Sequence, residues 1–351
     1  MFRLHRHGVV EVSKQIVQSP DALNDLALDD NGRLIISSVQ GFVFVGDTTL
    51  ANFISFTAIQ APNVSLWQTS LTFAKHVADA TPAPLVTSTS STLANISGRL
   101  KVQTGDRVGI GGFIVTGTGT KKVVLRGIGP SLSSSFGTGA LQDPILELRD
   151  ASGALIASND DWMTAPAHDE INSKGLAPGN NQESALSQAL PVGSYTAILR
   201  GKNNGAGIGL IELYDVDGGT TAKLANISTR GYVDRGDNVI IGGFIINGKA
   251  IDGNGGKVVV RGIGPSLTQS GVTGALQDPT LDLYNVFGWR LASNDNWRNT
   301  DPAGIQGARL APRNQRESAI LATLSSGAYT AILRGKNNTT GIGLIEVYSL
   351  Q

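Results

Sequence analysis

The chain contains no cysteine among its 351 residues. Disulfide bonds, thiolate metal sites and cysteine nucleophiles are therefore excluded, although the redox compartment stays open. Charged residues make up only 16% of the chain, and lysine plus arginine equal aspartate plus glutamate at 28 each. Since no basic block stands out, the sequence lacks the positive surface that nucleic acid or an anionic membrane requires. We expect neither of these partners.

Long apolar runs are also missing. No stretch approaches the roughly 18 consecutive apolar residues of a membrane-spanning helix, so we expect no membrane span. Near the N-terminus, Glu11 and Lys14 interrupt the apolar stretch that follows the basic residues, which leaves it too short for the core of a secretion signal. An extracellular or cell-surface location would therefore require an export signal upstream of Met1. The chain would then be the C-terminal part of a larger protein.

The sequence is rich in glycine, with 44 residues, and it contains an internal repeat. Several strings occur twice; for example, LANIS begins at 93 and 224, RGIGPSL at 126 and 261, and YTAILRGKNN at 195 and 329. Short insertions in the connecting loops account for the differences in spacing. Many glycines and few charged residues favour short strands joined by tight turns over long helices. We therefore predict an all-β fold.

Alternating patterns predict the strands of each copy of the repeat. Leu146 and Leu148 point to one side of a strand, while Glu147 and Arg149 point to the other. Such alternation indicates one buried face and one face in water. The pattern recurs at 281–284, and turn residues separate the other apolar runs at the close spacing of a sandwich or jelly roll. We expect about eight strands per copy.

These patterns predict two tandem β-sandwich domains, jelly-roll-like and joined end to end, preceded by a partial β segment. The expected parts are the partial β segment at 1–77, a linker rich in proline, serine and threonine at 78–92, copy 1 at 93–219 and copy 2 at 220–351. The composition of the linker makes it the clearest boundary. Because each copy has its own strands and turns, we expect residues 93–351 to fold without the first segment.

The first segment does not share the repeat. Alternating stretches at 33–38 and 41–47 predict a hairpin, and those at 53–59 and 69–77 predict further strands. The stretch LNDLALDDNGRLIISS, with its Asp-Asn-Gly turn, resembles one blade of a bacterial β-propeller. A single blade cannot bury its own faces, so the resemblance implies that the rest of a propeller precedes Met1.

The central part of copy 1 reads LELRDASGALIASNDDW, followed by ESALSQALPVGSYTAILRG. This part resembles the bacterial pre-peptidase C-terminal family, whose pattern is a strand ending in Asp, a Gly turn, a strand ending in Asn-Asp, and a strand with Leu, Pro, Gly and Tyr. The matching residues are Asp150, Gly153, Asn159, Asp160, Leu190, Pro191, Gly193 and Tyr195, and in copy 2 Gly288, Asn294, Asp295, Leu324, Gly327 and Tyr329. Copy 2 departs from the pattern at Asn285 and Ser325, and RGIGPSL lies outside it.

The resemblance implies a β-sandwich of the kind appended to secreted proteases and other exoenzymes. It therefore implies a non-catalytic C-terminal region of an exported bacterial protein, which acts as a spacer, a stabiliser or a binding module. Two alternatives stay open: a pair of carbohydrate-binding modules appended to a secreted hydrolase, and an enzyme with a site in the N-terminal segment. The four histidines are His5, His7, His76 and His168, and they form no recognisable catalytic motif, so we expect no enzymatic activity.

An acidic turn recurs in both copies and is a candidate calcium site. The candidate ligands are Asn159, Asp160, Asp161 and Glu183 in copy 1, and Asn294, Asp295, Asn296 and Glu317 in copy 2. Ca²⁺ takes six or more oxygen ligands of this kind, and modules that resemble these sometimes hold it, although the spacing matches no EF-hand. The alternative is that the turn residues hydrogen-bond their own backbone while the glutamate pairs with an arginine.

A tryptophan follows the acidic turn in each copy, Trp162 in copy 1 and Trp297 in copy 2. If the rings are exposed, they are ligand-binding residues that stack on sugars, and the partner is a polysaccharide or another cell-surface component. If they are buried, they are core residues or a lid over the end of the sandwich. The sequence alone leaves both interpretations open.

Arginines recur at strand ends in both copies. They are Arg126 and Arg200 in copy 1, and Arg261 and Arg334 in copy 2. One interpretation is that they clamp a carboxylate or a sugar hydroxyl of a ligand. The other is that they pair inside their own module with acidic residues such as Asp143 and Asp278, or Glu212 and Glu346.

Overall fold

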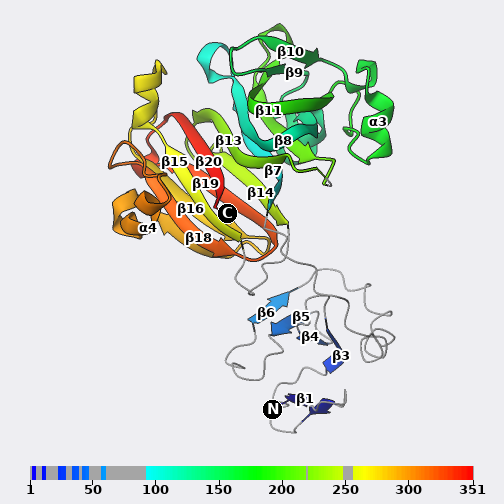
Figure 1. Cartoon of the computed structure of the whole chain (residues 1–351), viewed down its shortest axis with the longest axis vertical. Coiled ribbons are helices and arrows are strands. Elements are labelled where there is room, and N and C mark those ends of the chain that lie inside the picture. Colours follow the sequence, from blue (N-terminus) through cyan, green and yellow to red (C-terminus); the bar gives the residue numbers. More distant parts are fainter. Residues whose placement is uncertain are drawn as a thin grey trace. The chain divides into compact units, whose positions relative to one another are not determined.

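Strands dominate the computed structural model of the chain, which confirms the predicted all-β class (Figure 1). The structure describes the backbone of strands within residues 2–60, and it describes residues 92–351 apart from 219, 248–255 and 351. In this described part of the chain, no helix is long and apolar enough to cross a membrane.

Two compact units make up the chain, Met1–Val86 and Thr87–Gln351. The second unit therefore contains both copies of the repeat. The linker predicted at 78–92 lies outside the described residues, except for its last residue.

In its described residues, the first unit contains two small antiparallel sheets. One pairs β1 (Phe2–Leu4) with β2 (Val10–Val12), and the other follows the order β3 (Leu23–Leu28), β4 (Leu34–Ser38), β5 (Phe42–Gly46) and β6 (Thr57–Gln60). The hairpin predicted at 33–38 and 41–47 is confirmed as β4 and β5. The strand predicted at 69–77 lies outside the described residues. A four-stranded meander is also the arrangement of a propeller blade, but that resemblance stays a prediction.

The two copies form the same succession of strands. Those of copy 1 are β7 (Thr92–Val102), β8 (Gly109–Ile128), β9 (Pro144–Arg149), β10 (Leu155–Asn159), β11 (Ser184–Gly201) and β12 (Gly207–Asp215). Those of copy 2 are β13 (Lys223–Val233), β14 (Ile240–Asn247), β15 (Gly256–Ile263), β16 (Pro279–Asn285), β17 (Arg290–Asn294), β18 (Ser318–Leu324), β19 (Gly327–Gly335) and β20 (Gly341–Leu350). The long strands β8 and β11 correspond to β14 with β15 and to β18 with β19, so the described part of copy 2 has the predicted eight strands.

Short helices lie in the connections between strands. The α-helices are α2 (Ser133–Phe136), α3 (His168–Ser173) and α4 (Pro302–Gly307). The 3₁₀ turns are η2 (Gly105–Arg107), η3 (Pro130–Leu132), η4 (Gly137–Gly139), η5 (Trp162–Thr164), η6 (Lys202–Asn204), η7 (Pro265–Ser270), η8 (Trp297–Asn299) and η9 (Lys336–Asn338).

Each copy folds as a two-layered sandwich because its two long strand segments pass from one layer into the other. In copy 1, residues 109–115 of β8 pair with 193–199 of β11, and residues 120–127 of β8 pair with 184–191 of β11. Residues 196–201 at the end of β11 pair with β9 in one layer. Residues 123–128 at the end of β8 pair with β12 in the other layer. In the described part of copy 2, β14 with β15 and β18 with β19 take the places of these two long strands.

The two layers of each sandwich pack closely at glycines. A Cβ atom at Gly127 would lie 2.7 Å from Cδ1 of Leu199 in the opposite layer, and a Cβ at Gly262 would lie 2.7 Å from Cδ1 of Leu333. Real Cβ atoms do not approach other atoms so closely, so only glycine permits this separation of the layers. The repeated glycines of the RGIGPSL strings therefore have a packing role.

The two copies are joined edge to edge in both layers, rather than end to end as the sequence led us to expect. Strand β7 of copy 1 pairs with β14 of copy 2, and β13 of copy 2 pairs with β8 of copy 1. Layer 1 follows the order β17-β16-β19-β14-β7-β12-β8-β11, and layer 2 follows β10-β9-β11-β8-β13-β20-β15-β18 (Figure 1). The physical reason is that a separate copy would leave these edges unpaired.

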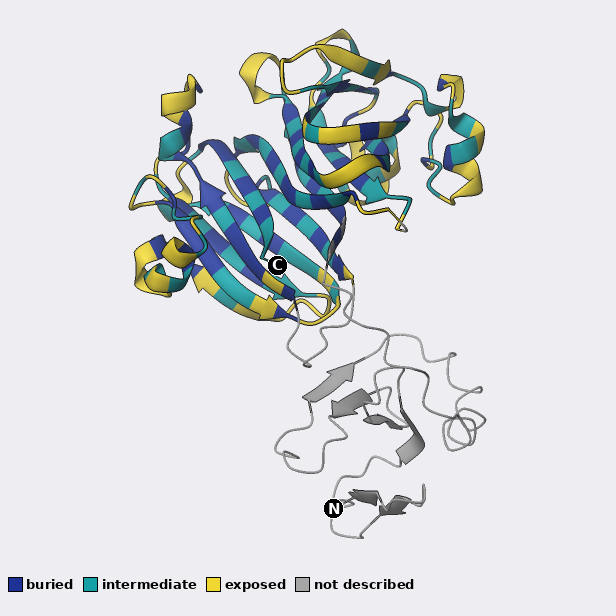
Figure 2. Ribbon diagram, viewed as in Figure 1, coloured by how far each residue is buried: buried dark blue, intermediate teal, exposed yellow. Residues whose placement is uncertain are grey.

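One apolar core runs through both copies. It includes Leu100 and Val102 of copy 1 and Val233, Ile240 and Phe244 of copy 2, all of them buried. Buried and partly buried residues alternate along the strands on both sides of the join (Figure 2). The join is thus part of the core of a single body.

Polar contacts across the join follow an approximate two-fold symmetry. Arg99 and Arg230 stand at equivalent positions, and burial lowers the pKa of each, while the nearby carboxylates of Asp237 and Asp106 oppose this effect. Arg99 also donates a hydrogen bond to the carbonyl oxygen of Asp237 at 3.1 Å. Because each arginine meets the other copy's aspartate, the two copies hold each other in register.

Candidate functional site

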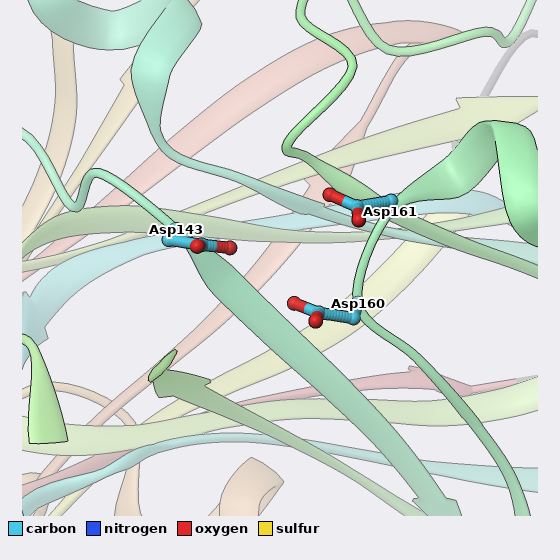
Figure 3. A group of neighbouring side chains, drawn as sticks. All are labelled: Asp143, Asp160 and Asp161. Carbon is cyan, nitrogen blue, oxygen red and sulfur yellow. The ribbon is translucent and has the colours of Figure 1, made fainter. Parts of the chain in front are cut away.

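Three carboxylates converge at one end of copy 1. They belong to Asp143, which precedes β9, and to Asp160 and Asp161, which follow β10, and each offers an oxygen within 4.8 Å of the others. In Figure 3 the side chain of Asp143 points toward the other two. Strands β9 and β10 form an antiparallel hairpin, so the residue before one strand and the residues after the other lie at the same end. The sequence prediction included Asp160 and Asp161 but missed Asp143 as a member of this cluster.

A lysine partly neutralises this cluster. The Nζ of Lys202 lies 2.6 Å from Oδ2 of Asp160 and 3.6 Å from Oδ2 of Asp143. Burial raises the pKa of the Asp143 carboxyl, and Asp160 and Asp161 add to this against the effect of Lys202. The Oδ1 atoms of Asp143 and Asp160 are buried and accept no hydrogen bond in the described part of the chain. The cluster therefore has unused oxygen ligands and an excess of negative charge.

The equivalent cluster of copy 2 carries one carboxylate fewer. Asp278 and Asp295 correspond to Asp143 and Asp160, but an amide, Asn296, replaces the third carboxyl. The Nδ2 of Asn296 donates to Asp295 at 3.3 Å, and the Nζ of Lys336 lies 2.5 Å from the same carboxylate. Copy 2 thus balances more of its negative charge with its own side chains.

The predicted ligands Asn159 and Asn294 support the backbone instead of the cluster. The Oδ1 of Asn159 accepts a hydrogen bond from the backbone N–H of Ala185 at 2.9 Å, and its Nδ2 donates to the carbonyl of Asp161 at 3.0 Å. Asn294 makes the same two contacts in copy 2. These bonds use both ends of each amide, one within the turn and one to the backbone of β11 or β18.

The predicted ligands Glu183 and Glu317 are also engaged elsewhere. Glu183 is fully buried, and its Oε1 accepts from the backbone N–H groups of Gly129 and Ser131, both at 2.9 Å. Its Oε2 accepts from the hydroxyl of Ser131 at 2.7 Å. Glu317 closes the second RGIGPSL loop in the same way, through Ser266. The structure therefore does not bring these glutamates into the acidic cluster.

The two tryptophans predicted to stack on sugars pack against apolar clusters of their own copies. Trp297 is only 3% exposed and packs against Ile305 and Ala319. Trp162 is half-buried and packs against Val124 and Ile171, beside helix α3. The burial of Trp297 favours the interpretation that it is a core residue. The structure leaves the role of the partly buried Trp162 open, so its stacking on a sugar stays a prediction.

An exposed apolar hairpin in copy 2 was missed by the sequence prediction. In the turn between β16 and β17, the side chains of Val286, Phe287 and Trp289 are 66%, 55% and 42% exposed, and that of Leu291, in β17, is 46% exposed. The rings of Phe287 and Trp289 lie 5.9 Å apart at an angle of 49°. Copy 1 has the small residues Ala151, Ser152 and Ala154 in place of the first three. This difference between the copies is the signal that could have identified the hairpin.

A pocket of about 520 Å³ lies beside this hairpin. Val286 belongs to both, and Tyr284, Thr330 and Ile332 line the pocket on the outer side of β16 and β19. Apolar side chains in a concave setting are typical of binding sites for small molecules and short chains. The hairpin and the pocket together are here called the aromatic surface.

The strand-end arginines Arg126 and Arg261 pair inside their own copies, as one of the two interpretations predicted. Arg126 Nη2 lies 2.5 Å from Oε2 of Glu212, and Arg261 Nη2 lies 2.5 Å from Oε2 of Glu346. Burial, and then the neighbouring glutamate, raise the pKa of the adjoining Tyr214 to about 12. These networks are saturated and support the fold.

Comparison with known proteins gives no family for the chain. No protein-family model matches the sequence, and no curated protein matches it.

Proposed function

We propose that residues 93–351 are a non-catalytic binding module of a larger exported protein, and that the aromatic surface of copy 2 binds a polysaccharide. The observation that carries this proposal is the exposure of Phe287 and Trp289 at the tip of one hairpin. An aromatic side chain gains favourable free energy when roughly 150–250 Å² of its surface is buried. Leaving two of them in water, in one copy alone, favours a binding role over a structural one.

A sugar chain suits this surface better than a protein does. A hydrogen-bonding group adjoins the rings: Arg290 follows Trp289 in the chain and is exposed, and it lies 3.6 Å from Asp282, which also lies 3.2 Å from Arg334. Aromatic faces pack on the C–H groups of a sugar ring, while guanidinium and carboxylate groups bond its hydroxyls. A stable protein interface usually takes about 800 Å² from each partner, which is more than a hairpin of this size offers.

The position of the hairpin supports the same function. Strand β17 is the outermost strand of layer 1, so the hairpin is accessible along its outer side. Most of the remaining edge surface of the two copies is used in joining them. The joined body therefore acts as a rigid spacer with a binding surface at one end of layer 1.

Affinity electrophoresis in gels that contain a panel of neutral polysaccharides tests the proposal. We expect at least one polysaccharide to retard the protein, and Trp289→Ala or Phe287→Ala to abolish the retardation without lowering the melting temperature. The matched control is Ile156→Ala, since Ile156 stands at the position of Leu291 and is also exposed. If no polysaccharide retards the protein, or if Trp289→Ala migrates as the parent does, the proposal fails.

We propose as a second function that the acidic cluster of copy 1 binds Ca²⁺ and stabilises the module. Two buried carboxylate oxygens without hydrogen-bond donors favour it, because a hard cation would satisfy both. Asp278 and Asp295 of copy 2 have such oxygens too, but the third carboxylate, that of Asp161, belongs to copy 1. The residues that fit the ion are Asp143, Asp160 and Asp161, with Lys202 moved aside. Glu183 and Asn159 lie outside this ligand set because the fold itself uses their oxygens.

A further inference from the structure

Copy 1 contains a second pocket, remote in sequence from the aromatic surface. Its volume is about 300 Å³, and its lining includes Gln103, Thr104, Arg149, Ile198, Arg200 and Asn204. The polar residues come from the turn after β7, from β9 and from the turn after β11. Val108 and Ile198 provide an apolar wall. This arrangement combines polar donors with a surface for C–H groups.

The pocket carries an excess of positive charge. Arg149 and Arg200 both donate to the same carboxylate, that of Glu147. Arg149 is fully held, since its Nη1 also donates to the carbonyl of Gly153 at 2.8 Å. For Arg200, only Nη2 has a partner in the described part of the chain. The guanidinium groups of Arg149 and Arg200 therefore share the single negative charge of Glu147. Arg200 keeps N–H donors that a ligand could use.

Neutral donors line the same pocket as this partly paired guanidinium. The amide nitrogens of the Gln103 and Asn204 side chains and the hydroxyl of Thr104 have no hydrogen-bond partner among the described residues. A guanidinium is the side chain that matches a carboxylate best, because two of its N–H groups can donate in parallel. The amides and the hydroxyl suit the alcohol groups of a sugar.

We infer that this pocket binds an acidic sugar through its carboxylate, as in a uronic acid unit. The volume is at the lower end of the range for small-molecule sites and admits a single sugar unit rather than a folded chain. Arg200 takes the carboxylate, the neutral donors take hydroxyls, and the apolar wall takes the C–H face. The site is separate from the aromatic surface, so the two proposals stand or fail independently.

Copy 2 provides an internal comparison. The positions of Gln103, Thr104 and Arg149 are occupied by Asp234, Arg235 and Tyr284. Asp234 is an acceptor that already pairs with Lys101 at 3.1 Å. The donor set that favours an acidic sugar thus belongs to copy 1.

Saturation-transfer NMR and calorimetry on the full chain test this inference. The probes are trigalacturonate, the neutral galactose trimer, acetate and inorganic phosphate. We expect trigalacturonate alone to give saturable binding, and this binding to weaken as salt is added. Thr104→Glu places a negative charge beside the pocket and should weaken binding by at least about tenfold, the effect expected when a charge-assisted hydrogen bond is opposed.

The controls separate the possible outcomes. Arg235→Glu introduces the same side chain at the matched position of copy 2 and should leave trigalacturonate binding unchanged. Arg200→Gln should reduce binding while the melting curve shows a folded protein. The inference is overturned if trigalacturonate does not bind, if phosphate or the neutral trimer binds equally well, or if Thr104→Glu and Arg235→Glu have equal effects.

Discussion

Gly98 and Thr229 occupy the same position in the two copies, and they contact each other across the join. A Cβ atom added to Gly98 would lie only 2.4 Å from Oγ1 of Thr229. The symmetry of the repeat is therefore broken at this point, because the space between β7 and β13 holds one side chain and not two. Because Thr229 of copy 2 fills this space, the equivalent position of copy 1 must be glycine.

Gly98→Ala should destabilise the second unit by about 1–3 kcal/mol, the usual cost of overpacking a filled core. The double variant Gly98→Ala, Thr229→Gly returns the space and should recover most of the loss. Chemical denaturation of the parent, both single variants and the double variant measures this as a double-mutant cycle. Additive effects in the cycle would show that the two residues do not share one space.

Separated copies should not behave as independent domains. A fragment of residues 93–219 exposes the paired edges of β7 and β8, and a fragment of residues 220–351 exposes those of β13 and β14. Unpaired edges recruit other strands, so each fragment should self-associate or aggregate, and mixing should yield a one-to-one complex. The intact segment 93–351 should unfold in one transition without residues 1–77. Light scattering that finds both fragments monomeric and as stable as the intact segment would contradict this.

Lys121→Met should destabilise the second unit by about 3–5 kcal/mol, the usual cost of removing one partner from a buried ion pair. Lys121 is 2% exposed, and its Nζ lies 2.9 Å from carboxylates of both Asp215 and Asp217. Copy 2 has the uncharged residues Gly256, Ser349 and Gln351 at these three positions. Replacing the charges together, with Asp215→Ser and Asp217→Gln added to Lys121→Met, should therefore restore much of the stability. A triple variant as unstable as the single one would refute this account.

The same lysine predicts a loss of stability at high pH. Burial lowers the pKa of Lys121, but its bonds to Asp215 and Asp217 outweigh this and hold the pKa above its ordinary value of 10.5. A raised pKa means that the folded state keeps its proton longer than the unfolded chain. The contribution to stability is thus complete below pH 10.5 and lost as the pH rises through the folded-state value. In Lys121→Met, denaturation curves should lack this part of the alkaline slope.

Calcium should raise the melting temperature of the full chain, and Asp160→Asn should abolish the effect. A ligand at a hundredfold excess over its Kd adds about 2.7 kcal/mol to the free energy of unfolding. Asp295→Asn is the matched control in copy 2, and it should leave the effect in place because copy 2 has one carboxylate fewer. Since the pKa of Asp143 is raised above 3.8, protons should compete with calcium at a higher pH than for an ordinary aspartate. Superimposed melting curves in calcium and in EDTA would exclude the site.

Strand positions could be predicted well from sequence, because burial on one side of a strand leaves an alternating pattern. Leu146 and Leu148, predicted to face the core, are fully buried, as are Leu281 and Leu283. The way in which the copies join could not be predicted. A strand such as LANIS has the same alternation whether one of its edges is paired or both, since edge pairing uses backbone atoms that are common to all residues.

The candidate sites were harder to predict than the strands. Trp297 and Trp289 have the same side chain, and only the packing around each decides that the first is buried and the second exposed. Asp143 entered the acidic cluster because a hairpin returns Asp160 to its side, a relationship that depends on strand register. The carboxylate of Glu183 could bind a cation, but its oxygens already accept hydrogen bonds from Gly129 and Ser131 of the loop that it closes.

The strands by which the chain enters and leaves the second unit are both interior strands. Strand β7 lies between β14 and β12, and β20 lies between β13 and β15. Neither end of the unit can therefore peel away unless two ladders of hydrogen bonds break at once. A pulling force applied to the two ends of the unit acts first on β7 and β20, which are paired on both edges. The outer strands separate only after the hydrogen bonds of β7 and β20 break. The join between the copies thus makes the unit resistant to tension applied at its two ends.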